Sequence, residues 1–345
     1  MHICDLGEQG LLQRLQSFCP SDVIGDDAAL MTVTPGHQLV VTTDVLVDGV
    51  HFSWGNANPE VWTTSPHDAG WRAAAANLSD LAAMGAHPLG ITVGLSLPPR
   101  LLVADLEAFY TGLVDCLTPF DVPIVGGDVC RSSVMTVAIA AFGQVIPQHA
   151  IYRSAAQPGD AIIATGYHGG SRTGLELLLH PEQGIGLSKD DYHYLIQTHQ
   201  RPHPRLDVVD QLDTIRHHCV RPQNALNTFR VAGMDSSDGL ADAVLQICRA
   251  SRVGARIDRQ AIPIPPALSQ WRSPEIAMRW ALYGGEDFEL VLCCQDAIAH
   301  DLIRQIGSPA AIIGTITSEV EVILTDSTGE WNNEMIQFSH SFQHF

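Results

Sequence analysis

The feature that most constrains this chain is an aspartate that recurs where short apolar runs end. Each run is typical of a β-strand, and the aspartate that follows has Gly, Ser or Thr beside it. A single acid of this kind would be an ordinary turn residue. Several of them, spread along the chain, predict that distant segments deliver carboxylates to one place. The acids concerned are Asp26 and Asp27, Asp44, Asp128, and Asp235 with Asp238.

Carboxylates that gather in this way repel one another and are tolerated mainly when a cation lies among them. Hard oxygen ligands favour Mg²⁺ or Ca²⁺ over zinc. Thr42 and Thr43 place two hydroxyls next to Asp44, and Asp80 lies in a helix of small apolar residues where an unpaired charge is costly. The sequence therefore predicts a hard-cation site. Taken singly, each motif is also compatible with a plain turn or an ordinary helix N-cap.

The charged residues exclude several classes of protein. The formal net charge of −19 argues against a nucleic-acid partner, which requires a basic face. Lys189 is the only lysine, and no G-x-x-x-x-G-K-[ST] stretch is present. Both a Walker-type phosphate loop and the protein-kinase scheme depend on a lysine in a specific setting. Phosphate chemistry would therefore rest on metal ions, arginines and backbone amides.

The eight cysteines form no C-x-x-C pair, so neither a zinc site nor a disulfide framework is indicated. Reduced thiols are typical of a cytoplasmic protein, which is the expected location. The N-terminal residues do not resemble a signal peptide, and no apolar run is long enough to span a membrane.

Hydrophobic periodicity predicts a mixed α/β (α+β) protein of two domains. Helices are expected at 8–18, 65–84, 103–117, 173–180 and 238–251. Strands are expected at 28–33, 38–43, 89–97, 122–126, 134–145, 161–165, 288–293, 311–316 and 320–325, with the last two forming an antiparallel pair. A turn-rich stretch near 147–160 suggests a boundary that divides the chain into domains 1–148 and 149–345.

The motifs together resemble the thiamine-monophosphate kinase family. The resemblance is carried, in order along the chain, by Ile24 to Asp27, Thr42 to Asp44 with His51-Phe52, Asn77 to Ala86, Gly126-Gly127-Asp128, Tyr152-Arg153-Ser154 with Pro158-Gly159-Asp160, Arg201-Pro202 with Arg205, Asp235 to Leu240, Gly284 to Leu290, and His344-Phe345.

This resemblance implies an aminoimidazole-ribonucleotide-synthetase-like fold with two α/β domains, the N-terminal one forming a homodimer. It implies an enzyme that transfers the γ-phosphoryl group of ATP directly onto thiamine monophosphate, the last step of thiamine diphosphate biosynthesis. Several Mg²⁺ ions would act between the substrates. The nucleophile is a phosphate oxygen that is already anionic near neutral pH, so no general base is needed.

The resemblance also implies individual roles. Metal ligands would be Asp27, Thr42, Thr43, Asp44, Asp80, Asp128, Asp235 and Asp238. ATP contacts would be Tyr110, Gly127, Asp128, Arg153 and Ser237, and thiamine monophosphate would contact His51, Glu286 and Phe342. Asp26 receives no role.

One position departs from the family pattern. The family commonly has a Gly-aromatic pair near its C-terminus, and here Ser341 precedes Phe342. Two alternatives stay open at this point. One is another ATP-using enzyme of the superfamily, although Cys4 and Cys19 lack the setting of the reactive cysteine of selenophosphate synthetase. The other is a non-catalytic module that binds nucleotide or thiamine phosphate.

Overall fold

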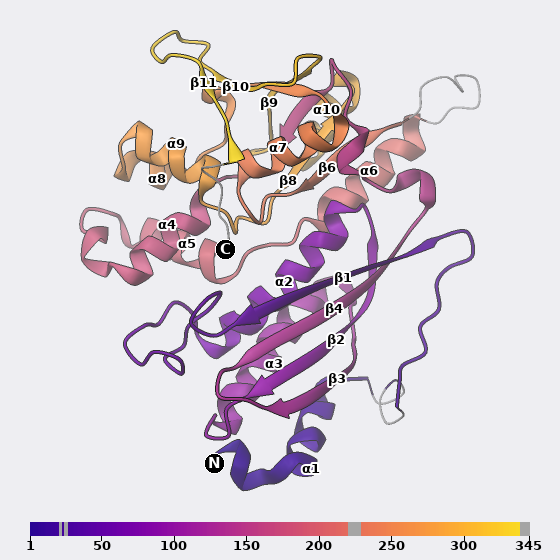
Figure 1. The fold of residues 1–345 in the computed structure, drawn as a ribbon, viewed down its shortest axis with the longest axis vertical. Helices are drawn as coiled ribbons and strands as arrows, with labels where there is room; N and C mark the ends of the chain where they lie inside the picture. Colours follow the sequence, from indigo (N-terminus) through magenta and orange to yellow (C-terminus); the bar gives the residue numbers. More distant parts are fainter. Residues whose placement is uncertain (21–22, 24–26, 220–228, 339–345) are drawn as a thin grey trace.

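The computed structural model describes residues 1–20, 23, 27–219 and 229–338. Two β-sheets, each with packed helices, lie one above the other in Figure 1. The first half of the chain contributes α1 (Ile3–Leu15), β1 (Gln38–Val47), α2 (Pro66–Ala83), β2 (His87–Leu97), α3 (Val103–Leu117), β3 (Ile124–Arg131) and β4 (Thr136–Val145).

The second half is longer and richer in helices. It contains β5 (Ala161–Ala164), α4 (Gly170–Leu179), α5 (Lys189–Gln200), α6 (Leu206–Cys219), β6 (Val231–Asp235), α7 (Leu240–Ser251), β7 (Gly254–Asp258), α8 (Pro266–Trp271), α9 (Pro274–Tyr283), β8 (Leu290–Cys294), α10 (Asp296–Ile306), β9 (Ala311–Thr317), β10 (Val322–Thr325) and β11 (Glu334–Met335).

The four-stranded sheet has the order β1-β4-β2-β3, in which only the β2–β3 pair is parallel. Alternate residues of β4 are buried, so one face of this sheet carries the core. Helices α2 and α3 cover that face (Figure 1). The two helices lie so close together that a Cβ atom on Gly70 would be 1.9 Å from the carbonyl oxygen of Phe109. Glycine is therefore required at this crossing.

The seven-stranded sheet has the order β11-β10-β7-β9-β5-β8-β6. Every residue of β5, β6 and β8 is buried, which is typical of strands covered on both faces. Leu290 and Leu292 pack on one side in a core shared with α6, α10 and the helices of the first half, whereas Val291 packs on the α7 side. The apolar core therefore continues from one half of the chain into the other.

The mixed α+β class is confirmed, and several elements match their predicted ranges. Ser65 caps α2 and accepts a hydrogen bond from the backbone N–H of Asp68, and Pro66 occupies the first turn. Helix α3 occupies its predicted range. Among the helices in the described residues, none has the length and hydropathy that a bilayer-spanning segment needs.

Three local predictions are wrong. Residues 28–33 form no strand, and Leu30 is fully exposed. The strands predicted at 311–316 and 320–325 do not pair, because β7 lies between β9 and β10 and pairs with both. The helix predicted to start at residue 238 starts at Leu240, after Gly239 with its φ of 106°, and has no side-chain cap. For β9 and β10, adjacency in the sequence suggested a hairpin, but each of these strands pairs with β7 instead.

Candidate active site

A cavity of about 430 Å³ lies between the two halves of the chain. We call it the central cavity. Its walls come from β1 and α2 on one side, and from the β6–α7 turn and the loop before β8 on the other. It gathers seven of the residues predicted to act in the site: Asp44, His51, Asp80, Asp235, Ser237, Asp238 and Glu286.

Three carboxylates of the central cavity come from three different elements. Asp44 lies on β1, Asp80 near the end of α2, and Asp235 at the end of β6. Asp235 is buried, and it accepts hydrogen bonds from Ser79 Oγ at 2.8 Å and from Ser237 Oγ at 2.9 Å. Thr42 Oγ1 donates to Asp80 Oδ2. Hydroxyls thus hold two of the acids in place without neutralising their charge.

The carboxylates raise one another's pKa. Burial raises the pKa of Asp44 to about 6, and the neighbouring Asp235 and Asp238 contribute to the shift. Burial likewise raises the pKa of Asp80 to about 6, with Asp44 adding to the rise, while Arg153 opposes it. Burial and Asp80 raise the pKa of Asp235 to about 6. Oxygen donors that repel one another in this way fit a divalent cation, which would relieve the repulsion.

The central cavity also carries groups other than these acids. The imidazole of His51 is fixed locally, because the backbone N–H of Val47 donates to its Nδ1 at 3.1 Å. Glu286 forms an ion pair of 2.6 Å with the buried guanidinium of Arg72. Arg172 also lines the cavity. The cavity therefore combines carboxylates with cationic and neutral hydrogen-bonding groups.

The loop that carries Glu286 has a strained backbone. Glu286 has a φ of 58° and Phe288 a φ of 52°, and side chains as large as theirs rarely adopt this region. The N–H of Glu286 donates to the carbonyl oxygen of Ser237 at 2.7 Å. Asp287 accepts from the backbone N–H groups of Gly169 at 2.7 Å and Ser171 at 2.8 Å. These bonds to two other segments hold the loop in its conformation.

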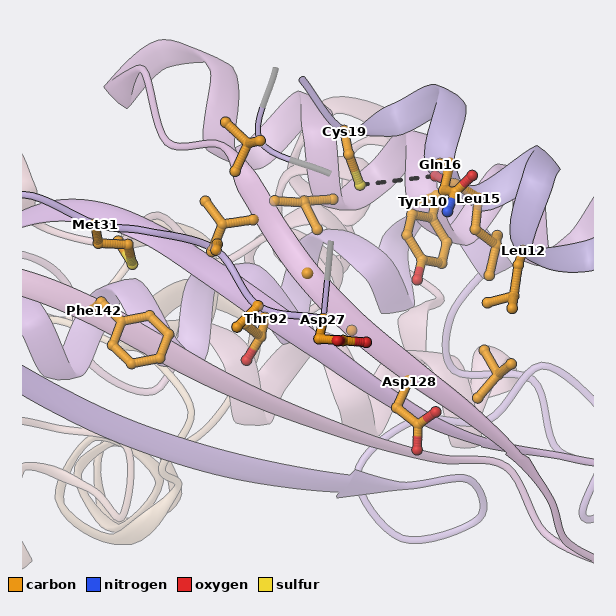
Figure 2. Close-up of a pocket in the computed structure, with 18 of the residues that line it drawn as sticks. Leu12, Leu15, Gln16, Cys19, Asp27, Met31, Thr92, Tyr110, Asp128 and Phe142 are labelled. Carbon is orange, nitrogen blue, oxygen red and sulfur yellow. Dashed lines mark hydrogen bonds between the residues drawn. The ribbon is translucent and has the colours of Figure 1, made fainter. Parts of the chain in front are cut away.

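A second cavity of about 550 Å³ lies beside β3, which is one of the two edge strands of the four-stranded sheet. We call it the edge cavity. Asp27 enters it from the loop before β1, Tyr110 from α3, and Asp128 from β3 (Figure 2). Gly127 also lines it, and a Cβ atom there would lie 2.2 Å from the carbonyl oxygen of Val93. Three elements far apart in sequence thus meet at the Gly-Gly-Asp motif.

The structure therefore divides the predicted site residues between two cavities. Thr43 lies on the face of β1 opposite Asp44 and donates to the carbonyl oxygen of Ile139 at 2.9 Å. Arg153 is exposed and lies near enough to Asp80 to lower its pKa. Phe342 and Asp26 fall outside the described residues. Within the described part of the chain, no three His, Cys, Asp or Glu side chains form a ready-made metal site.

Sequence reasoning missed several residues around the central cavity. Arg72 pairs with Glu286, and buried His199 lies 3.8 Å from the same carboxylate. Arg172 was also not identified, and Asp287 lay within the Gly284 to Leu290 motif without an assigned role. A signal for Arg72 was present: Arg72, Ala76 and Asp80 follow one another at intervals of four residues, and all three line the cavity.

Comparisons with known proteins now identify the family. The N-terminal domain of AIR synthase related protein matches residues 25–145, and its C-terminal domain matches residues 157–327. A thiamine-monophosphate kinase of Synechococcus elongatus is 50% identical over 345 residues, covering 99% of this chain and 98% of the relative. The chain belongs to the thiamine-monophosphate kinase family. The predicted family and fold are thus confirmed, and the chain is an enzyme of the kinase class.

Solved structures agree with this family. The thiamine-monophosphate kinase of Stenotrophomonas maltophilia has a TM-score of 0.75 and 31% identity, covering 92% of this chain and 95% of that one. AaThiL complexed with AMPPCP and TMP has a TM-score of 0.68 and 27% identity, covering 98% of this chain and 99% of that one. Matches over nearly the full length mean that both halves of the fold are shared with these kinases.

Proposed function

We propose that this member of the family transfers the γ-phosphoryl group of ATP directly, in line, to thiamine monophosphate, giving thiamine diphosphate and ADP. The observation that carries the proposal is the central cavity, in which seven predicted site residues from both halves of the chain come together. The AaThiL complex with AMPPCP and TMP supports the choice of the two substrates.

Several Mg²⁺ ions are part of this proposal. They would be held by Asp44, Asp80, Asp235 and Asp238 in the central cavity and by Asp27 and Asp128 in the edge cavity, with Thr42 and Thr43 next to Asp44 on β1. When bound, Mg²⁺ neutralises phosphate oxygens and holds them in line. The chain supplies the hard oxygen donors; burial and the neighbouring acids raise the pKa of Asp44 and Asp235, and a bound cation would offset both effects.

The remaining residues would bind and orient the two substrates. His51, Glu286 and Phe342 would contact thiamine monophosphate. Tyr110, Gly127, Asp128, Arg153 and Ser237 would contact ATP. Because the attacking phosphate oxygen is already anionic, the chain has no proton to remove, and its contribution is to position two polyanions.

We also propose that the N-terminal domain, residues 1–148, pairs with a second copy of itself, and that residues 149–345 form the other domain. The support is the outer face of β1, where Leu39, Val41 and Val45 are 50%, 58% and 52% exposed. An apolar sheet face of this kind marks an interaction surface.

We further propose a cytoplasmic location. All cysteines whose side chains the structure describes are free thiols, which supports this location.

The test is direct. The protein is incubated with ATP, Mg²⁺ and thiamine monophosphate, and the products are separated by chromatography. We expect equal amounts of thiamine diphosphate and ADP, and no product when EDTA replaces Mg²⁺. Unphosphorylated thiamine serves as the control acceptor. Binding of both substrates without conversion would favour a non-catalytic binding module, and release of ADP without thiamine diphosphate would point to another reaction of the superfamily.

A further inference from the structure

Arg72 is a buried cation at the boundary between the two halves of the chain. It lies on α2, and only 2% of the residue is exposed. A buried guanidinium needs a countercharge and hydrogen-bond acceptors. Its Nη2 contacts Glu286 Oε1 at 2.6 Å, and its Nη1 donates to the carbonyl oxygen of His199. Arg72 therefore joins α2 to two segments of the second half.

The pair with Glu286 is asymmetric. The guanidinium is covered, whereas 35% of the Glu286 side chain is exposed, and Glu286 lines the central cavity. An ion pair that only joined two domains would not need to present one partner to a cavity. Arg72 borders the same cavity but is almost wholly covered, and it holds one oxygen of the carboxylate.

The third member of the group, His199, supplies no competing charge. It is buried, and burial together with Arg72 and Arg172 holds its pKa well below the usual range. The ring is therefore neutral near pH 7. Its Nδ1 lies 3.0 Å from Ser171 Oγ and 3.8 Å from Glu286 Oε2. The positive charge that balances Glu286 in this group thus comes from Arg72.

The backbone contacts near Glu286 explain why its side chain needs a further partner. The loop is held at both sides of Glu286, by the bond from its own N–H to Ser237 and by the bonds that Asp287 accepts from the start of α4. These contacts fix the Cα position but leave the side-chain torsions of Glu286 free. A charge-assisted bond from a buried guanidinium restricts those torsions before a ligand arrives.

We propose that Arg72 is a positioning residue for the phosphate acceptor, acting by holding the Glu286 carboxylate oriented toward the acceptor's cationic ring. This inference rests on the proposed function, because the thiazolium ring of thiamine monophosphate carries a permanent positive charge. A fixed carboxylate near that ring contributes binding energy without first losing rotational freedom. In this proposal Arg72 acts on the acceptor through Glu286 and not by a contact of its own.

The experiment compares Arg72→Met and Arg72→Lys with a matched control, Arg216→Met. Arg216 is also a buried arginine, 5% exposed, and it joins segments by pairing with Asp213 and donating to the carbonyl oxygen of His149. It lines neither cavity. KM for each substrate, kcat and the melting temperature are measured for the whole protein.

We expect R72M to raise KM for thiamine monophosphate by about 10- to 100-fold, the ratio that a lost charge-assisted hydrogen bond of about 1.5–3 kcal/mol produces. KM for ATP should change by less than about threefold. R72K keeps a positive charge near Glu286 and should recover part of the loss. R216M should lower the melting temperature while leaving both KM values close to the wild type. Equal increases in both KM values, or the same change in R216M, would overturn the proposal.

A double-mutant cycle with Glu286→Gln tests whether Arg72 acts through Glu286. In the E286Q background, R72K should add little to KM for thiamine monophosphate, because the carboxylate it holds is gone. Full multiplication of the two effects would contradict the proposal. R72K keeps this test available if R72M does not fold. An inactive wild-type protein would refute the proposed function instead, so the two failures are distinguishable.

Discussion

At the scale of single residues, the carboxylates of this protein fall into two groups that differ in their surroundings. Asp287 is stabilised by two backbone N–H groups, and Glu286 by a guanidinium. Asp44 and Asp235, by contrast, have mainly other acids and hydroxyls around them. A carboxylate with a cationic partner supports the structure by itself, whereas a group of acids without one is suited to an added cation. The chemical roles follow from this difference.

Replacing Asp44 or Asp128 by Asn should reduce kcat by about 100-fold or more, because each change removes a charged oxygen ligand while keeping the side chain's shape. Circular dichroism and thermal melting should remain close to the wild type. Assays at saturating Mg²⁺ check the outcome, with Asp105→Asn in the first turn of α3 as the control. Near-normal turnover in both variants would contradict the metal-ligand assignment.

The pKa of Asp44 predicts how stability depends on pH. Its folded-state pKa of about 6 lies above the unfolded value of about 3.9, so the folded state binds more protons between these values. Its contribution to stability is therefore fully present below about pH 4 and is lost as pH rises through about 6. In EDTA, lowering the pH from 8 to 5 should raise the free energy of unfolding of the wild type more than that of D44N. A wild-type-minus-variant difference that is equal at both pH values would refute this assignment.

At the scale of elements, close approach of backbones determines which residues can be used. Helices α2 and α3 cross where Gly70 meets Phe109 and Gly112 meets His67, whose carbonyl oxygens would lie 1.9 Å and 1.8 Å from added Cβ atoms. This packing places α2 beneath β1. Asp80 of α2 and Asp44 of β1 therefore reach the same cavity. Small residues at a helix crossing thus determine the position of two site residues.

Replacing Gly70 by Ala should destabilise the protein by about 3 kcal/mol, because the methyl group meets backbone that cannot move without separating the helices. Gly10→Ala in α1 is the matched control, since its Cβ meets the movable end of Leu6. That change should be neutral or slightly stabilising, as alanine favours a helix. Denaturant unfolding measures both variants, and equal midpoints would contradict the packing argument.

At the scale of the whole molecule, the halves share both a core and a site. The apolar core runs from the N-terminal helices through α6 and α10. Ser79 reaches Asp235 at 2.8 Å, Trp71 Nε1 donates to the carbonyl oxygen of Pro202 at 2.8 Å, and Arg201 contacts Asp68 at 2.6 Å. These contacts hold the walls of the central cavity together, so the site depends on the position of both halves.

The exposed face of β1 predicts the assembly. Val41→Lys would place a charge on this apolar surface, and burying an unpaired charge in an interface is costly. We expect the wild type to be a dimer and V41K a monomer in size-exclusion chromatography with light scattering. Val320→Lys, on an exposed valine before β10, is the control and should leave the dimer intact. An unchanged mass for V41K would place the interface elsewhere.

The sequence by itself determined the kinds of chemistry and the elements with strong local signals. The acids after apolar runs, the single lysine, the Ser65-Pro66 helix start and the family motifs were all readable without coordinates, because propensity, capping and composition are local properties. The tertiary structure alone decided the partition of the acids between two cavities, the insertion of β7 between β9 and β10, and the pairing of Arg72 with Glu286. These features join residues far apart in the chain, and their energies depend on burial and distance, which no local pattern specifies.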